Sequence, residues 1–377
     1  FLTKLYNKLR SNIKMTQVNF IKYISSKLKE ISRKNQFRHI ETCYRKEKNI
    51  ILKNKRKFIS FSCNDYLSLS NNTQVKKAAN KATIKYGTGS AASRLITGNN
   101  PLYFKLENKL SKMKNTESCT VFGSGYLAVL GVVSALVKKN DIIVLDEYCH
   151  SCAFLGAKAS GAKIMKFKHN NTKDLEKILF NHRFKYDKCL IVTEGVFSMD
   201  GDISPQDEIL KIKKKFNALL LLDDAHGFGV LGNESGSNRT LKKNNPIDIY
   251  IGTLSKAVGS YGGYVCSKKI IIDFIINRCR TQIYTTGLPP SVIAAAIKSL
   301  EIIEKQKELV KIPIENANYF CEKMNIKKTG TPIIPIIVNS EKKAINISNY
   351  LMNKGILVSA IRPPTVPNNT SRLRLAF

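Results

Sequence analysis

Short apolar segments alternate with helix-like stretches through the middle of this chain, and this alternation restricts the fold more than any other feature. The stretches between the apolar segments, such as 174–180 and 205–216, carry apolar residues at helical spacing. Strands that alternate with helices form a mostly parallel sheet covered by helices on both faces. We therefore predict an α/β fold with strands at 119–122, 142–145, 162–167, 189–193, 218–222, 247–251 and 263–266.

The pattern changes after about Pro290, which indicates a second, smaller domain. A chain of 377 residues is long enough for a large core and an appended domain. The later elements are a long helix, a strand at 333–338, a helix near 344–354 and a final strand near 372–376. We expect an N-terminal helical segment at 1–60, a large α/β domain at 61–290 and a small α/β domain at 291–377.

The chain is strongly basic, with a formal net charge of +34, which raises nucleic acid or a membrane surface as a partner. The basic residues are mostly Lys and are spread along the chain rather than gathered in one stripe. The longest apolar run, at 125–137, is shorter than the roughly 20 residues that cross a bilayer. We therefore expect neither partner, and a nucleic-acid binder stays an alternative that steeply salt-dependent DNA affinity would reveal.

Nine cysteines, an odd number without framework spacing, indicate a reducing compartment, and we expect the protein in the cytoplasm. One close pair, Cys149 and Cys152, suggests a zinc or redox site as an alternative. No second CxxC or His pair completes four ligands, so we expect no metal.

Lys256 lies among small residues just after the predicted strand at 247–251. Asp223 directly follows a strand of four leucines, where a carboxylate is costly to bury without a cationic partner. A pyridoxal phosphate (PLP) enzyme needs both groups, because an amine forms the Schiff base and a carboxylate holds the pyridinium nitrogen. The glycine turn at 123–126 precedes an apolar helix, whose N-terminus favours a phosphate. Together these features predict a PLP enzyme.

Three longer motifs resemble the α-oxoamine synthases, a family of fold-type I PLP enzymes that condense an amino acid with an acyl-CoA and release CO2. The motifs are TEGVFSMDGD at 193–202, DDAHG at 223–227 and GTLSK at 252–256. The resemblance runs from about Phe61 to Phe377. It implies a fold-type I PLP transferase, with a large mostly parallel sheet domain and a smaller C-terminal α/β domain, that forms a homodimer with shared active sites.

The resemblance also assigns catalytic roles by motif position. Lys256 is the Schiff-base lysine, and its freed amine is the natural base for the Cα proton of the amino acid. Asp223 is the partner of the pyridinium nitrogen. His226 and Ser198 are expected near the phenolic oxygen of the cofactor, and His150 is expected to stack on its ring.

Other positions match binding contacts. Gly125 and Tyr126 are expected to hold the cofactor phosphate through backbone N–H groups, and Thr253 through its hydroxyl. Thr286 matches a position that reaches the phosphate of the partner subunit. The implied substrate contacts are Asn64 and Arg374 for the amino-acid carboxylate and Arg38 for a carboxylate on the acyl chain.

The segment IRPPTVP at 361–367, followed by RLRL at 372–375, is most similar to the branch that joins L-alanine to pimeloyl-CoA, or to a pimeloyl carrier protein, in biotin biosynthesis. Glycine C-acetyltransferase and 5-aminolevulinate synthase share the scaffold and are the alternatives. A catalytically impaired relic is another, because Ser68 and Val129 stand where the family usually has Gly and Asn. The family also usually continues beyond Phe377, so we expect a shortened small domain. Ser68 is unfavourable if its backbone needs a positive φ.

Overall fold

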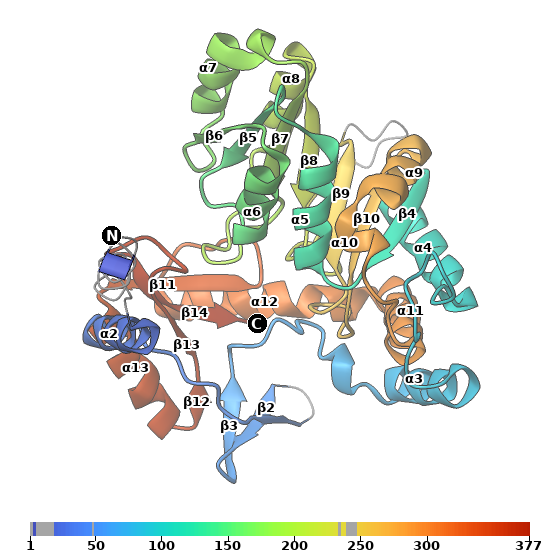
Figure 1. Ribbon diagram of the computed structural model, residues 1–377. Coiled ribbons are helices and arrows are strands. Elements are labelled where there is room, and N and C mark those ends of the chain that lie inside the picture. The colour runs from blue at the N-terminus through green and yellow to red at the C-terminus, as the bar shows by residue number, and fades with distance from the viewer. Residues whose placement is uncertain (1–2, 5–18, 47–48, 233–234, 239–246) are drawn as a thin grey trace.

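The computed structural model describes residues 3–4, 19–46, 49–232, 235–238 and 247–377 (Figure 1). Its centre is a seven-stranded sheet in the order β4-β10-β9-β8-β7-β5-β6, in which β10 alone is antiparallel to its neighbours. The predicted α/β fold is confirmed, and each predicted strand is present within two residues of its expected bounds. The strands are β4 (Ser118–Phe122), β5 (Ile142–Asp146), β6 (Lys163–Phe167), β7 (Cys189–Glu194), β8 (Leu219–Asp223), β9 (Ile249–Thr253) and β10 (Gly263–Ser267).

Helices cover both faces of this sheet and make two hydrophobic cores. Ile142 and Val144 of β5 pack into one core, whereas Ile143 and Leu145 pack into the other. Successive residues of a strand point to opposite faces, so a strand that is apolar throughout serves both cores. The helices of this part are α3 (Thr73–Tyr86), α4 (Pro101–Lys114), α5 (Gly125–Leu136), α6 (Ser151–Ser160), α7 (Thr172–His182), α8 (Gln206–Lys215), α9 (Lys269–Arg278) and α10 (Arg280–Ile283), with short 3-10 turns at Leu69–Asn71 and Arg183–Lys185.

A smaller domain follows α11 (Pro290–Lys305), and its predicted elements are confirmed. Its sheet has the order β11-β14-β13, and both pairings are antiparallel. Ala317 and Cys321 of one helix pack against Ile334 and Leu373 of this sheet. The elements are α12 (Lys307–Met324), β11 (Ile333–Asn339), α13 (Glu341–Asn353), β12 (Ile356–Leu357), β13 (Ser359–Ile361) and β14 (Ser371–Ala376), and they lie below the central sheet in Figure 1.

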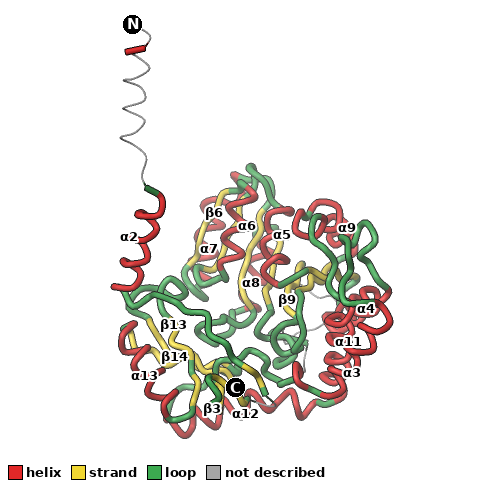
Figure 2. The backbone as a smooth tube through the Cα atoms, turned by 60° about the horizontal axis from the view of Figure 1, so that its bottom comes forward, coloured by secondary structure: helices red, strands yellow, loops and turns green. Residues whose placement is uncertain are grey.

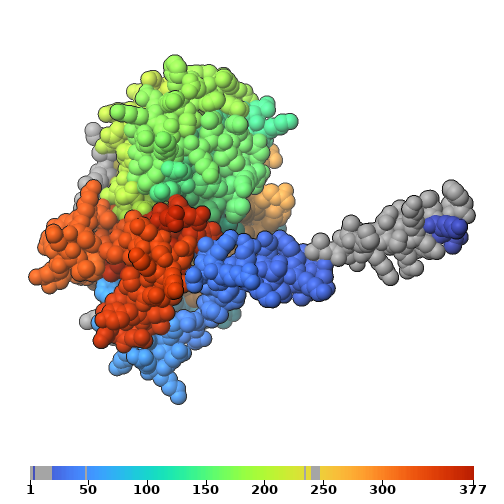
Figure 3. Space-filling view, turned by 90° about the vertical axis from the view of Figure 1, so that its left-hand side faces the viewer, coloured from blue at the N-terminus to red at the C-terminus, as the bar shows by residue number. Residues whose placement is uncertain are grey.

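The N-terminal part contains strands that the sequence analysis did not predict. They are β1 (Tyr44–Arg45), β2 (Ile50–Lys53) and β3 (Arg56–Ser60), and β3 pairs in parallel with β12 of the small domain. α2 (Phe20–Arg33) has no buried residue and lies at the edge of the molecule, beside the small domain (Figures 2 and 3). Within the expected segment 1–60, residues 1–2, 5–18 and 47–48 lie outside the described part.

Among the described residues, no helix combines the length and the apolar character that a membrane crossing requires.

Candidate active site

Three neighbouring strands end at one edge of the central sheet, and their ends carry candidate catalytic groups. β7 ends at Glu194, β8 at Asp223 and β9 at Thr253, and Glu194 is the register partner of Asp223. Lys256 follows β9 by three residues. Ligands of open α/β sheets bind beyond the carboxyl ends of strands. This edge is therefore the candidate active site.

The amine of Lys256 lies against the His226 ring, with 2.7 Å between Nζ and Nε2. Burial lowers the pKa of Lys256 to about 8, although the nearby carboxylates of Asp223 and Glu194 oppose that shift. Burial also lowers the pKa of His226 well below its ordinary value, so its ring is neutral. Since a neutral amine is the nucleophile that attacks an aldehyde, a lysine with this pKa is suited to form a Schiff base near neutral pH.

Hydrogen bonds connect His226 to the small domain through Tyr66. Tyr66 Oη lies 2.7 Å from His226 Nδ1, and Arg374 donates from Nη2 to the same hydroxyl over 3.5 Å. Burial raises the pKa of Tyr66 to about 12, so the phenol keeps its proton. Arg374, on β14, also donates from Nε to the carbonyl oxygen of Ser198. Lys256, His226, Tyr66 and Arg374 thus form one chain of contacts from the large domain to the small one.

Two carboxylates, the buried Glu194 and the half-buried Asp223, accompany this chain and indicate which group the site accepts. Burial, with a further contribution from Asp223, raises the pKa of Glu194 to about 8, and burial also raises the pKa of Asp223. Glu194 accepts the backbone N–H of His150 at 2.6 Å, and Asp223 accepts that of Ala225 at 3.1 Å. Carboxylates in such a place are stabilised by a cation. A protonated pyridine nitrogen supplies that charge, so the residues present fit PLP.

The candidate place for the cofactor phosphate is where α5 begins beside the end of β9. A β-carbon on Gly125 would lie 3.3 Å from Thr253 Cβ, and one on Gly263 would lie 2.5 Å from the nitrogen of Gly125. Glycine at both positions lets the helix N-terminus and the strand approach each other closely. The Thr253 hydroxyl donates to the Gly262 carbonyl at 2.9 Å. Because a helix N-terminus favours an anion, Gly125, Tyr126 and Thr253 remain candidates to hold a phosphate.

His150 and Ser198 line a cleft of about 710 Å³, the main cleft, bounded by residues 147–151 and 197–200 of the large domain and 364–367 of the small domain. Burial lowers the pKa of His150, and its ring meets Tyr126 edge to face at 6.0 Å between centroids. His150 Nδ1 lies 2.9 Å from the sulfur of Cys152. A neutral imidazole in this place is suited to stack on an aromatic ring.

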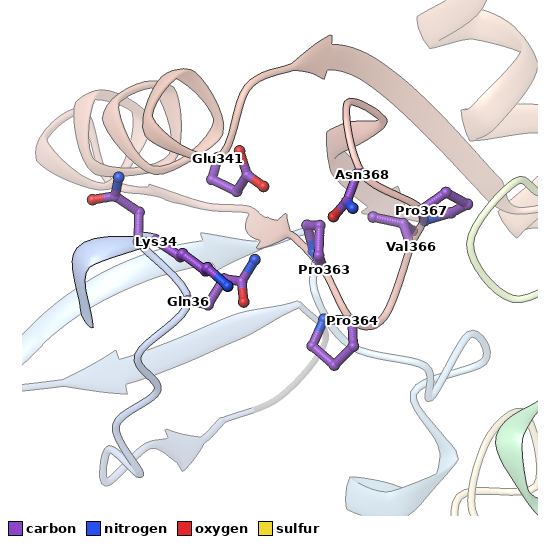
Figure 4. Close-up of a pocket in the computed structure, with 9 residues that line it drawn as sticks. Lys34, Gln36, Glu341, Pro363, Pro364, Val366, Pro367 and Asn368 are labelled. Atoms are coloured by element: carbon purple, nitrogen blue, oxygen red, sulfur yellow. The ribbon is translucent and has the colours of Figure 1, made fainter. Parts of the chain in front are cut away.

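A second cavity, the arm groove, has a volume of about 660 Å³ and lies between the chain after α2 and the segment 363–368 (Figure 4). Its lining residues Pro364, Val366 and Pro367 also line the main cleft, so this segment is the wall between the two cavities. Arg38 approaches this wall, donating from Nη2 to the Pro363 carbonyl and the Thr365 hydroxyl over 3.4 Å each.

Two further predicted residues lie apart from the contact chain of Lys256. Thr286 is exposed and forms an isolated bridge with Ser93. The side-chain oxygen of Asn64 is buried and has no hydrogen-bond partner among the described residues.

Ser68 has a φ of 52°, so the positive φ that would make its side chain unfavourable is present. Val129, on α5, is buried in the hydrophobic core.

Sequence reasoning missed Tyr66 and Glu194. Glu194 ends its strand as the direct register partner of Asp223, and that parallel placement is a signal that the sequence carried. Tyr66 lies two residues after Asn64, but its contact with His226 depends on a loop whose path the sequence did not reveal.

Comparisons with known proteins agree with this geometry. The family model for aminotransferase class I and II matches residues 56–377. The chain is 47% identical over 327 residues to an 8-amino-7-oxononanoate synthase from Methylocella silvestris, covering 87% of this chain and 93% of the relative. It is 41% identical over 355 residues to one from Beijerinckia indica, covering 94% and 92%.

Solved structures show the same relationship. A serine palmitoyltransferase from Sphingomonas wittichii superposes with a TM-score of 0.87 at 28% identity, covering 96% of this chain and 93% of that one. The 8-amino-7-oxononanoate synthase from Francisella tularensis gives a TM-score of 0.71 at 32% identity, covering 85% and 92%. A serine palmitoyltransferase structure that contains PLP gives a TM-score of 0.82 at 28% identity, covering 89% and 87%. The chain therefore belongs to the aminotransferase class I and II family of PLP enzymes, within the α-oxoamine synthase branch formed by the 8-amino-7-oxononanoate synthases.

Proposed function

We propose that the protein condenses L-alanine with a pimeloyl thioester, on CoA or on a carrier protein, giving 8-amino-7-oxononanoate, the free thiol and CO2 in biotin biosynthesis. Relatives that bear this enzyme name match most of the chain. The observation that carries the proposal is the contact chain from Lys256 through His226 and Tyr66 to Arg374. It brings an amine with a lowered pKa and a guanidinium together beside the candidate PLP site.

Bound PLP supplies an electron sink that stabilises negative charge at the substrate Cα. Asp223 would hold the protonated ring nitrogen that makes this sink effective. The amine of Lys256, with a pKa of about 8, would take the proton from Cα and return one to the product. Arg374 and Asn64 would hold the alanine carboxylate, which fixes the Cα bond that breaks.

Two arginines support a terminal carboxylate on the acyl substrate. Burial lowers the pKa of Arg362, and the nearby charge of Arg38 lowers it further. Arg362 donates to the carbonyl of Asn35 at 3.0 Å, and its buried Nε has no hydrogen-bond partner among the described residues. Because like charges repel, a carboxylate between the two guanidiniums would be favourable. We propose that the pimeloyl carboxylate occupies this position, at the wall of the main cleft.

We also propose a homodimer in which Thr286 reaches the PLP phosphate of the partner subunit. Thr286 is exposed, and large apolar side chains near its bridge to Ser93 are exposed as well, namely Leu95, Ile96 and Tyr284. Such a patch favours burial in a subunit contact. Light scattering of the PLP-loaded protein tests the dimer, and a monomer with full activity would contradict the shared site. We also propose that the protein acts in the cytoplasm, on the basis of its cysteine usage.

A direct comparison of substrates tests the reaction. The PLP-loaded protein is mixed at equal concentrations with pimeloyl-CoA and L-alanine, with acetyl-CoA and glycine, or with succinyl-CoA and glycine, and free thiol is measured. We expect fastest release with the first pair, together with CO2. Faster release with either glycine pair would assign the protein to a sister activity, and no release with any pair would support a catalytically impaired relic.

A further inference from the structure

A buried ion pair lies directly behind the candidate PLP site. Lys114, the last residue of α4, places Nζ 2.6 Å from Oδ2 of Asp224, and both side chains are almost completely buried. Lys114 also donates to the carbonyl of Ser235 at 2.6 Å. The rings of Phe228 and Tyr250 lie 5.0 Å and 4.9 Å from the ammonium group. The cation thus connects α4 to Asp224, to the chain that follows it and to β9.

Three glycines close around the carboxylate of Asp224. β-Carbons added at Gly195, Gly227 and Gly236 would lie 2.5, 2.3 and 1.8 Å from its oxygens. The backbone N–H of Ser237 donates to both oxygens, at 3.1 Å and 3.2 Å. Glycine at these positions lets the backbone approach the carboxylate closely, and the Ser237 N–H and Lys114 hold it in place.

The backbone of Asp224 begins the turn that carries the catalytic candidates. Its N–H donates to the Ile251 carbonyl of β9 at 2.8 Å, and its carbonyl accepts the N–H groups of Gly227 and Phe228. Asp223 precedes this residue and His226 lies within the turn. Contacts that hold Asp224 in place therefore also set the separation between Asp223, the candidate partner of the pyridine nitrogen, and His226, which contacts Lys256.

We infer that the buried Lys114–Asp224 pair is a positioning device of the PLP site, which holds the turn at 223–228 so that Asp223 and His226 would both face the cofactor. Neither Lys114 nor Asp224 contacts the cofactor in this arrangement, and both act through the turn. Replacing one partner of a buried ion pair is strongly destabilising, because the other charge is then left uncompensated. Replacing both partners is often tolerated. This asymmetry provides the test.

The matched control is the Lys213–Asp248 pair. Its atoms are 2.7 Å apart, and Asp248 accepts the N–H of Leu220, so it serves the same two strands at their opposite ends. Lys213→Met therefore removes a partly buried ion pair that joins the same sheet, without touching the turn at 223–228.

The variants Lys114→Met, Asp224→Asn, their double combination and Lys213→Met are compared with the wild type. PLP affinity is measured by absorbance titration, and hydrogen exchange is measured in peptides that cover 223–228. We expect each single change in the Lys114–Asp224 pair to weaken PLP binding at least tenfold and to speed exchange in the turn. We expect the double variant to recover to within about threefold of wild type, and Lys213→Met to lower the urea midpoint while PLP affinity changes less than threefold.

The inference rests on PLP binding at the proposed site, but no substrate enters the test, so failure of the alanine and pimeloyl assignment leaves its result unchanged. If Lys114→Met proves insoluble, Asp224→Asn decides by the same threshold, because it keeps the shape of the side chain. PLP affinity in the single variants within threefold of Lys213→Met would overturn the inference. A double variant that binds PLP no better than the single variants would also overturn it, since the two charges would then act separately.

Discussion

Removing the guanidinium of Arg374 should abolish most of the affinity for L-alanine while the cofactor stays bound. The side chain is only 5% exposed, and its contacts in the described part of the chain are with neutral groups, the Ser198 carbonyl and the Tyr66 hydroxyl. A buried cation held by neutral partners is prepared to receive a carboxylate. Loss of a bidentate charge-assisted contact costs about 2–4 kcal/mol, or roughly 30- to 1000-fold at 1.4 kcal/mol per tenfold. We expect Arg374→Ala to raise the L-alanine Kd by that factor.

The measurement is a titration of the PLP-loaded protein with L-alanine, followed by the change in visible absorbance. Arg374→Lys is the matched variant, because it keeps the charge but not the planar fork, and we expect intermediate affinity. PLP affinity should change less than threefold in both variants, since Arg374 approaches the site from the small domain. An unchanged L-alanine Kd in Arg374→Ala, with folding intact, would refute its assignment to the carboxylate.

Four further outcomes follow from the site and its approach. Lys256→Ala should abolish covalent trapping of PLP by borohydride, and peptide mass spectrometry that finds another trapped lysine would contradict the assignment. Asp223→Asn should retain PLP but lower kcat roughly 10- to 100-fold, because a charge-assisted hydrogen bond is lost; an unchanged kcat would remove Asp223 from its role. Because the folded pKa of Glu194 is raised to about 8, its contribution to stability is present below pH 4.5 and lost as the pH rises through about 8. Glu194→Gln should therefore reduce the change of the urea midpoint with pH in the PLP-free protein across that window. A pH dependence equal to that of the wild type would refute the burial argument. Ser68→Gly should raise the free energy of unfolding by about 0.5–1 kcal/mol in urea titrations, because removing the strain of a left-handed side-chain residue outweighs the greater entropy of glycine in the unfolded chain. Ser68→Ala keeps the β-carbon and should give no gain.

The central sheet could be predicted because the sequence pattern that specifies each of its strands and helices is local. Each strand is a short run that is apolar on both faces, and the helices between the strands carry their own periodicity, so pattern and burial agree along the chain. The strands at 44–60 were not predictable in the same way. β3 pairs with β12, almost 300 residues later in the sequence, and Ile59 meets Ile356 only once the small domain has formed. A short, half-exposed hairpin supplies little periodicity of its own, so its tertiary partner decides its conformation.

The positions of Lys256 and Asp223 could be predicted for a similar reason, since residues at the ends of adjacent parallel strands share one edge of the sheet. The contacts that adjust their pKa values could not be predicted. Burial lowers the pKa of Lys256 against the opposing charges of Asp223 and Glu194, and burial together with Asp223 raises the pKa of Glu194. The sequence shows these groups only as three separate strand ends. Tyr66 joins the same group from a loop near the N-terminal hairpin, and Arg374 joins it from the last strand of the small domain. Parts of the chain that fold as separate layers thus meet at a single histidine, and the acid–base properties of Lys256 depend on how those layers pack more than on the motif in which it lies.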